Sequence, residues 1–319
     1  MYQWFLFFIL LIILLLVVLY NVVNYVEPHA LYYPSKKTVW RPKIPYKQVY
    51  INVNDVSDVV ENSKHKNKRA DYICGWHFSN FPGRKTVMFC HGTTGNISHR
   101  KYIIDICHKF KLNLLIFDTR GYYKSSAFPD KLFLREDGEV AFKYLRDYSK
   151  IKSSEIIVWG ESLGGVPAVW VASKYNCGGL ILLSTFSSLD ELVVNNLEGY
   201  KKTGVGLITK ILSYQMDMIP LKEYIKYVKC PVAVIHSDED DLIPYVCARN
   251  NYKNISHNNK IFVTIKGGHS SPEIKSEQLK EVFDFCSLPL DYSSDVDVSE
   301  MLGSLRTVAA RYHNFIESY

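Results

Sequence analysis

Three short stretches of the sequence hold side chains that together could attack a carbonyl carbon. The first, Gly160-Glu-Ser-Leu-Gly164, follows the apolar run 156–159 directly. A serine hydroxyl becomes a nucleophile only when it is exposed, oriented and hydrogen-bonded to a base. A sharp turn from a strand into a helix exposes such a serine, and glycines two residues to either side relieve the crowding of that turn. The pattern predicts a nucleophile elbow with Ser162 at its tip, flanked by Gly160 and Gly164; a helix N-cap is the alternative role for Ser162.

A general base for this serine is expected downstream, on a loop. His269 in Lys266-Gly-Gly-His-Ser270 comes after the last apolar run, 261–264, and the two glycines before it permit a bend that turns the imidazole inward. The alternative is an ordinary surface histidine in a turn. Its position after the final predicted strand favours the role of base.

A carboxylate is needed beside the imidazole, because it fixes the tautomer of the histidine and stabilises the imidazolium that forms during the reaction. It should follow the apolar run 232–235. Four acidic residues stand there in succession: Asp238, Glu239, Asp240 and Asp241. Composition does not separate the four, so one is expected to face inward and the others to lie in a solvated turn.

Backbone N–H groups that would bind a developing oxyanion are expected in two places. One is the N–H of Leu163, the residue after the nucleophile. The other is the N–H of Thr93 in the loop His91-Gly-Thr-Thr-Gly-Asn96, where Gly92 lets the backbone turn toward the site. Such a loop could instead bind phosphate, but it lacks both the Lys-Ser/Thr end of a P-loop and the G-x-G-x-x-G spacing.

The elements that must position these residues alternate along the chain from about residue 46. Runs that predict strands stand at 50–53, 72–76, 86–90, 114–117, 156–159, 180–183, 232–235 and 261–264. Helical patterns lie near 99–110, 133–148, 163–175, 243–253 and 276–286. This alternation predicts an α/β fold over 46–290, with a mostly parallel sheet of about eight strands and helices on both faces. Residues 189–226 break the rhythm and are either a crossover helix with a surface loop or a lid over the strand ends.

The two ends of the chain do not follow this pattern. Residues 4–23 are almost wholly apolar, and a helix of that length spans about 30 Å of hydrocarbon. No basic side chain precedes the run and no small-x-small site follows it, so a transmembrane anchor is favoured over a cleaved signal peptide. The prolines of 24–45 predict an extended linker. Residues 291–319 predict a tail with an amphipathic helix, for which packing on the domain is favoured over binding to a membrane or a partner.

Charge and cysteine content bear on location and partners. Basic residues follow the apolar span and none precedes it, which predicts a single-pass membrane protein with its large C-terminal part in the cytoplasm. Two glycosylation sequons, Asn96-Ile-Ser98 and Asn254-Ile-Ser256, would be used only if that part were lumenal.

The seven cysteines show neither metal-ligand spacing nor a complete disulfide framework. The net charge of +6 is spread along the sequence, which argues against a dedicated nucleic-acid binder.

Taken together, these segments resemble the α/β-hydrolase superfamily and, more narrowly, the membrane-anchored abhydrolase-domain serine hydrolases of the bud-emergence type. The resemblance covers about 46–287, matches the single N-terminal span, and rests on residues 89–100, 117–125, 160–165, 240–244 and 267–269. It implies the α/β-hydrolase fold. It also implies Ser162 as nucleophile, His269 as base, Asp240 as acid (four residues before the proline of its loop) and Thr93 and Leu163 as oxyanion donors. The chain departs from the family where Thr93-Thr94-Gly95 replaces Asn-Ala-Gly.

The expected function is hydrolysis of a carboxylic ester or thioester through an acyl-enzyme on Ser162, without a metal or organic cofactor. The anchor would hold the site near a bilayer, which favours a lipid or an acylated protein as substrate. The alternative, from another class, is a noncatalytic membrane scaffold or binding protein that retains the hydrolase fold. Neither the substrate nor its acyl chain length follows from the sequence.

Overall fold

The computed structural model describes residues 32–61, 71–127, 129, 131–188, 191 and 221–286. The predicted anchor, 4–23, and the predicted tail, 291–319, lie outside the described residues, as does most of the possible lid at 189–226. Among the residues that are described, none of the helices has the length and apolar character needed to cross a bilayer.

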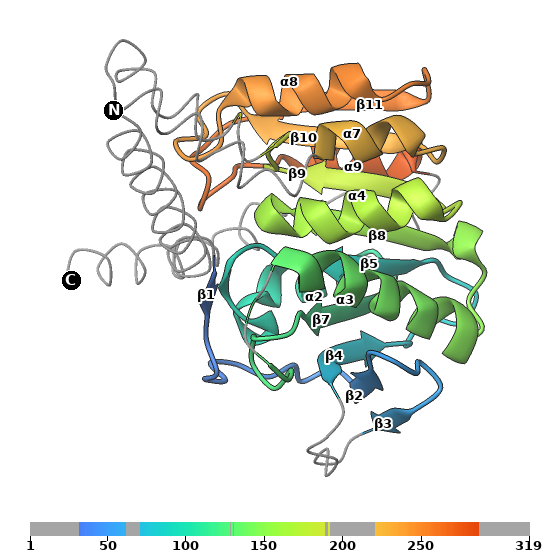
Figure 1. The fold of residues 1–319 in the computed structure, drawn as a ribbon. Helices are drawn as coiled ribbons and strands as arrows, with labels where there is room; N and C mark the ends of the chain where they lie inside the picture. Colours follow the sequence, from blue (N-terminus) through green and yellow to red (C-terminus); the bar gives the residue numbers. More distant parts are fainter. Residues whose placement is uncertain are drawn as a thin grey trace, which may run out of the picture.

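A nine-stranded sheet forms the centre of the domain (Figure 1). Eight of its strands are those that the apolar runs predict: β2 (Lys47–Asn52), β4 (Tyr72–Phe78), β5 (Thr86–Cys90), β7 (Asn113–Asp118), β8 (Ile156–Glu161), β9 (Gly179–Leu183), β10 (Val232–Ser237) and β11 (Lys260–Ile265). The ninth, β3 (Val59–Glu61), pairs antiparallel with β2 at the edge. It was not predicted, because three half-buried residues leave no apolar run to detect.

The strands lie in the order β11-β10-β9-β8-β5-β7-β4-β2-β3. Every neighbouring pair from β11 to β7 is parallel, whereas β4 pairs antiparallel with both β7 and β2. Nearly every residue of the central parallel strands is buried, because helices cover both faces of the sheet. The prediction of a mostly parallel sheet between two helical layers is confirmed.

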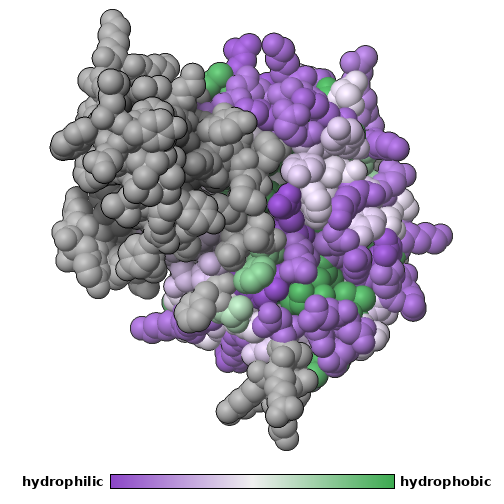
Figure 2. Space-filling model, in the orientation of Figure 1, coloured by the Kyte–Doolittle hydropathy of each residue, from purple (hydrophilic) through white to green (hydrophobic). Residues whose placement is uncertain are grey.

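The helices divide into two layers, each with its own apolar core. On one face lie α3 (Lys131–Lys143), α4 (Gly165–Lys174), α7 (Leu221–Tyr224) and α8 (Tyr245–Asn254). On the other lie α2 (Lys101–Lys109) and α9 (Ser276–Phe285). Successive residues of β5 alternate between the two cores, as side chains in a strand must. On the face that Figure 2 shows, the described residues are mainly hydrophilic, because these helices bury their apolar sides against the sheet.

The described part of the predicted linker, residues 32–45, lies against the domain. Its strand β1 (Tyr33–Pro34) pairs in parallel with β6 (Thr94–Gly95) in a separate two-stranded sheet. The side-chain amide of Asn96 donates to the carbonyls of Ser35 at 2.7 Å and Lys37 at 2.9 Å. The backbone of this segment is therefore bound to the loop that follows β5.

A buried histidine on β4 predicts a loss of stability in acid. Burial, with a smaller contribution from the charge of Lys47, lowers the pKa of His77 from its ordinary 6.5 to about 4. The unfolded chain therefore takes up a proton here at a higher pH than the folded protein does, and this shift corresponds to about 3 kcal/mol. As the pH falls from 7 to 4, the free energy of unfolding should fall more steeply for the wild type than for His77→Leu. Denaturant titrations at several pH values measure this, and parallel profiles would contradict a buried neutral imidazole.

Candidate active site

Ser162 stands in the turn from β8 into α4, in the single 3₁₀ turn η4 (Ser162–Gly164). Its φ of +52° is in the left-handed region, which is unfavourable for a residue with a side chain. The hydroxyl of Thr185 donates to the carbonyl of Ser162 at 2.6 Å and holds this conformation. The strained turn directs the Ser162 Oγ toward His269, whose Nε2 lies 3.0 Å away.

Close packing around the turn explains its glycines. A Cβ on Gly164 would lie 1.9 Å from the carbonyl oxygen of Cys90, and a Cβ on Gly160 would lie 2.6 Å from the carbonyl oxygen of Gly164. Helix α4 can therefore approach β5 and β8 this closely only because neither position carries a side chain.

Gly164→Ala is expected to destabilise the protein by about 3 kcal/mol or more, because the new methyl group overlaps backbone that cannot move aside. Gly164 has a φ of −63°, which alanine adopts freely, so packing alone should produce the effect. Gly83→Ala is the control: its φ is +74° but nothing lies within 4 Å of the added Cβ, so only about 1 kcal/mol should be lost. Guanidinium unfolding measures both, and equal losses would contradict the packing argument.

His269 and Asp240 extend the hydrogen-bond chain from the serine. Nδ1 of His269 lies 2.9 Å from Oδ2 of Asp240, whose side chain is fully buried. Burial opposes the charge of Asp240, but the hydrogen bond to His269 and those from the backbone outweigh it, so the pKa of Asp240 lies below its ordinary value. The ionised carboxylate accepts the hydrogen on Nδ1, and this leaves Nε2 to accept the hydroxyl hydrogen of Ser162.

The backbone of the loop that precedes α8 holds Asp240 in place. Its Oδ1 accepts from the N–H groups of Leu242 at 3.0 Å and Ile243 at 2.7 Å. The same carboxyl group lies 3.5 Å from Nε2 of the buried His236, which is itself bonded to the carbonyl of Ile243. Asp240 is thus the one acidic residue of its loop whose side chain faces the imidazole.

The three neighbours of Asp240 bind the loop that carries His269. Asp238 lies 2.9 Å from the amine of Lys266, and Glu239 accepts from the N–H of Gly267 at 3.0 Å. Oδ1 of Asp241 accepts from the backbone N–H of His269 at 2.9 Å. The turn is exposed, as predicted, but its carboxylates also fasten two loops together.

The loop after β5 lies against the nucleophile. A Cβ on Gly92 would be 3.2 Å from the Cβ of Ser162 and 3.7 Å from its Oγ, so no other residue type fits there without displacement. Thr93 follows Gly92 directly, and Leu163 follows Ser162. The structure therefore brings Ser162, His269 and Asp240 together. Thr93 and Leu163 each follow a residue that lies at this site.

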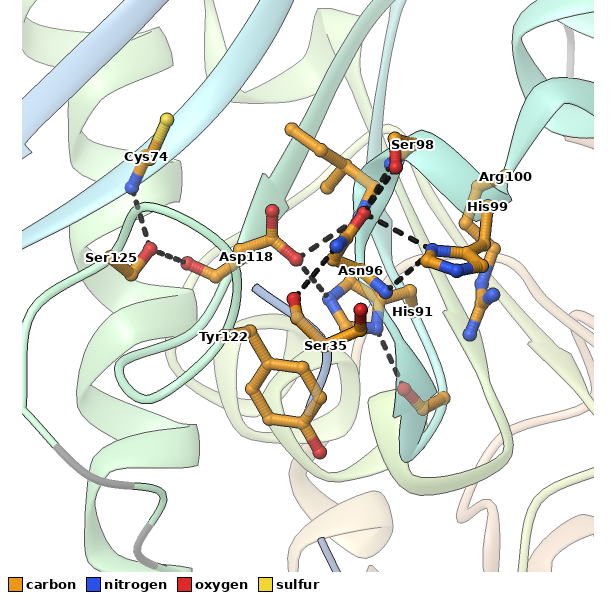
Figure 3. A network of polar contacts seen from close by, with 12 residues as sticks. Ser35, Cys74, His91, Asn96, Ser98, His99, Arg100, Asp118, Tyr122 and Ser125 are labelled. Atoms are coloured by element: carbon orange, nitrogen blue, oxygen red, sulfur yellow. Dashed lines mark hydrogen bonds and ion pairs between the residues drawn. The ribbon is translucent and has the colours of Figure 1, made fainter. Parts of the chain in front are cut away.

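Sequence reasoning assigned no role to the polar residues behind this loop. Figure 3 shows His91 between the loop and Asp118, with Tyr122 beside it. His91 follows β5, and Asp118 ends the neighbouring parallel strand β7. The signal available in the sequence was a pair of polar residues at the ends of two apolar runs, which on a parallel sheet meet at one edge.

Two other kinds of reactive site, a metal centre and a cysteine nucleophile, can be compared with the serine site in the described ranges. No group of three or more histidine, cysteine, aspartate or glutamate side chains there is arranged to hold a metal ion. All seven cysteines are buried and unpaired, and burial raises the pKa of each thiol above its ordinary value. These thiols therefore stay protonated and make poor nucleophiles.

Comparison with known proteins agrees with this architecture. No family model matches the chain. It is 27% identical over 238 residues to α/β hydrolase domain-containing protein 17C of Xenopus laevis, covering 74% of this chain and 72% of the relative. It is 27% identical over 164 residues to the bem46 protein of Schizosaccharomyces pombe, covering 50% and 53%. An esterase of Pyrococcus furiosus superimposes with a TM-score of 0.59 at 22% identity, covering 80% of this chain and 98% of that protein.

The resemblance inferred from the sequence is therefore confirmed: the chain has the α/β-hydrolase fold and is a homologue of the α/β hydrolase domain-containing 17 proteins and of bem46.

Proposed function

We propose that this protein is a serine hydrolase that cleaves a carboxylic ester or thioester through an acyl-enzyme on Ser162. The observation that carries the proposal is the unbroken hydrogen-bond chain from Ser162 through His269 to Asp240, at 3.0 Å and 2.9 Å. Residues from three distant parts of the chain form it, and the strained turn at Ser162 directs the hydroxyl into it. A binding protein has no need of this combination.

The geometry supports the following sequence of steps. Oγ of Ser162 attacks the substrate carbonyl while Nε2 of His269 takes the hydroxyl proton. The N–H groups of Thr93 and Leu163 bind the tetrahedral oxyanion. When the intermediate collapses, the imidazolium gives its proton to the leaving alcohol or thiol, and the acyl group stays on Ser162. Water then repeats the attack, with His269 as base, and releases the carboxylic acid and the free serine.

The comparisons support esters as the first substrates to test. An esterase of Pyrococcus furiosus and a monoacylglycerol lipase of Paleococcus ferrophilus have the same fold. We further propose that the predicted anchor at 4–23 holds the domain at the cytoplasmic side of a bilayer, which favours a lipid or an acylated protein as substrate.

A fluorophosphonate probe tests the proposal, because it phosphonylates only an activated serine. We expect stoichiometric labelling of the folded protein, with the adduct on the peptide that contains Ser162. A panel of p-nitrophenyl esters and acyl thioesters of increasing chain length then identifies the preferred acyl group. Folded protein that is neither labelled nor able to hydrolyse any member of the panel would refute hydrolysis and favour the noncatalytic scaffold.

A further inference from the structure

The imidazole of His91 occupies a buried position directly behind the proposed oxyanion site. Its side chain is 3% exposed, with Nδ1 2.7 Å from the carbonyl oxygen of Gly92 and Nε2 3.1 Å from Oδ1 of Asp118. A carbonyl oxygen can only accept a hydrogen bond, so Nδ1 must carry a hydrogen and donate it.

That hydrogen bond acts on the peptide group that carries a proposed oxyanion donor. The carbonyl of Gly92 and the N–H of Thr93 belong to one planar trans unit and point in opposite directions. A donor fixed on the oxygen therefore fixes the direction of the N–H. It also draws electron density toward the oxygen, which strengthens the N–H as a donor by ~10–30%. We propose that His91 is a positioning residue that aligns and polarises the Thr93 N–H; this inference rests on the function proposed above.

Asp118 holds the imidazole in the orientation this role requires. Its carboxyl group is fully buried, and Oδ1 also accepts from the N–H of Ile97 at 3.1 Å. Burial raises the pKa of Asp118, although the bond to His91 partly opposes that. If Asp118 is ionised, the imidazole carries a hydrogen on both nitrogens; if it is protonated, it donates to Nε2. Nδ1 donates to Gly92 in both arrangements.

Tyr122 holds the next peptide group of the same loop. Its ring packs edge-on against the imidazole of His91, with centroids 5.2 Å apart at 72°, and its hydroxyl donates to the carbonyl of Thr93 at 2.7 Å. The N–H of Tyr33 donates to that carbonyl as well, at 3.2 Å. Thr93 is thus fixed on both sides, and Figure 3 shows His91 and Tyr122 lying side by side behind the loop.

The test is His91→Leu, assayed with p-nitrophenyl butyrate and with a trifluoromethyl ketone, whose adduct on Ser162 carries an oxyanion. Loss of a complete oxyanion donor lowers kcat by about 10²–10³-fold, so its misalignment should lower kcat by about 10- to 100-fold. Affinity for the ketone should fall by a similar factor, while KM changes by less than about twofold. His91→Asn keeps an N–H near the position of Nδ1 and should recover most of both losses.

His77→Leu is the matched control, since His77 is also buried and bonded through Nδ1, to the hydroxyl of Tyr144 at 2.9 Å. It should lose stability while kcat and ketone affinity stay unchanged.

Wild-type kcat in His91→Leu, or equal losses in the Asn and Leu variants, would overturn the inference. If His91→Leu does not fold, Tyr122→Phe and His91→Asn provide the test. Tyr122→Phe should then show several-fold lower kcat and ketone affinity, and His91→Asn should stay near the wild type in both. A wild type without Ser162-dependent hydrolysis would overturn the proposed function, and this inference with it.

Discussion

Replacing Ser162 with alanine is expected to lower kcat for p-nitrophenyl butyrate by about 10⁴-fold or more. The methyl side chain cannot form an acyl-enzyme, and His269 then has no hydroxyl to activate at 3.0 Å. What remains is the rate that the oxyanion donors and substrate binding give to direct attack by water. Fluorophosphonate labelling should disappear in the same variant, while its unfolding transition stays cooperative.

Ser184 provides the control for this substitution. It directly follows the neighbouring strand β9, is buried, and also has a left-handed φ, of +46°. Its Oγ has no hydrogen-bond partner among the described residues. Ser184→Ala should therefore keep kcat within about twofold of the wild type, by the usual size of effects away from the reacting atoms. If Ser162→Ala kept substantial activity, or if kcat fell sharply only in Ser184→Ala, the nucleophile would be elsewhere.

Asp240→Asn is expected to lower kcat by about 10⁴-fold with little change in KM. An asparagine can present its amide N–H to Nδ1 of His269, which favours the tautomer with the hydrogen on Nε2. That nitrogen can then no longer accept the proton of Ser162. The carbonyl oxygen of the asparagine can still accept from Leu242 and Ile243, so the loop should keep its conformation.

Asp238→Asn is the matched substitution two residues earlier. Its side chain is 40% exposed and its partner is Lys266, in an ion pair that water screens. We expect kcat within about twofold of the wild type, measured on the same ester. Near-normal activity in Asp240→Asn, or a large loss in Asp238→Asn, would show that another carboxylate orients His269.

Much of the fold follows from the sequence, because its strong signals are local. A strand buried on both faces must be apolar along its whole length, so 86–90, 156–159 and 180–183 could be recognised without their neighbours. The edge strand β3 carries no such constraint and escaped prediction. The glycines around Ser162 were recognised by spacing, although the contact that requires Gly164, the carbonyl of Cys90, is visible only in the structure.

The choice among four adjacent carboxylates was a question that composition could not answer. Asp238, Glu239, Asp240 and Asp241 have nearly the same chemistry, and their roles differ only because the loop turns one side chain inward and leaves the others facing residues 266–269. The resemblance to a known family selected Asp240, and the structure shows the physical reason, which is burial beside the imidazole.

The sequence by itself determined which residue types were available for acyl transfer and which strands would carry them, because apolar runs and glycine spacing are read within a few neighbouring positions. Only the tertiary structure decided which of them meet. Ser162 and His269 are separated by 107 positions and His91 and Asp118 by 27, so each contact exists only through the order of strands in the sheet. The role proposed for His91 shows this most clearly, since it depends on the direction of one peptide group.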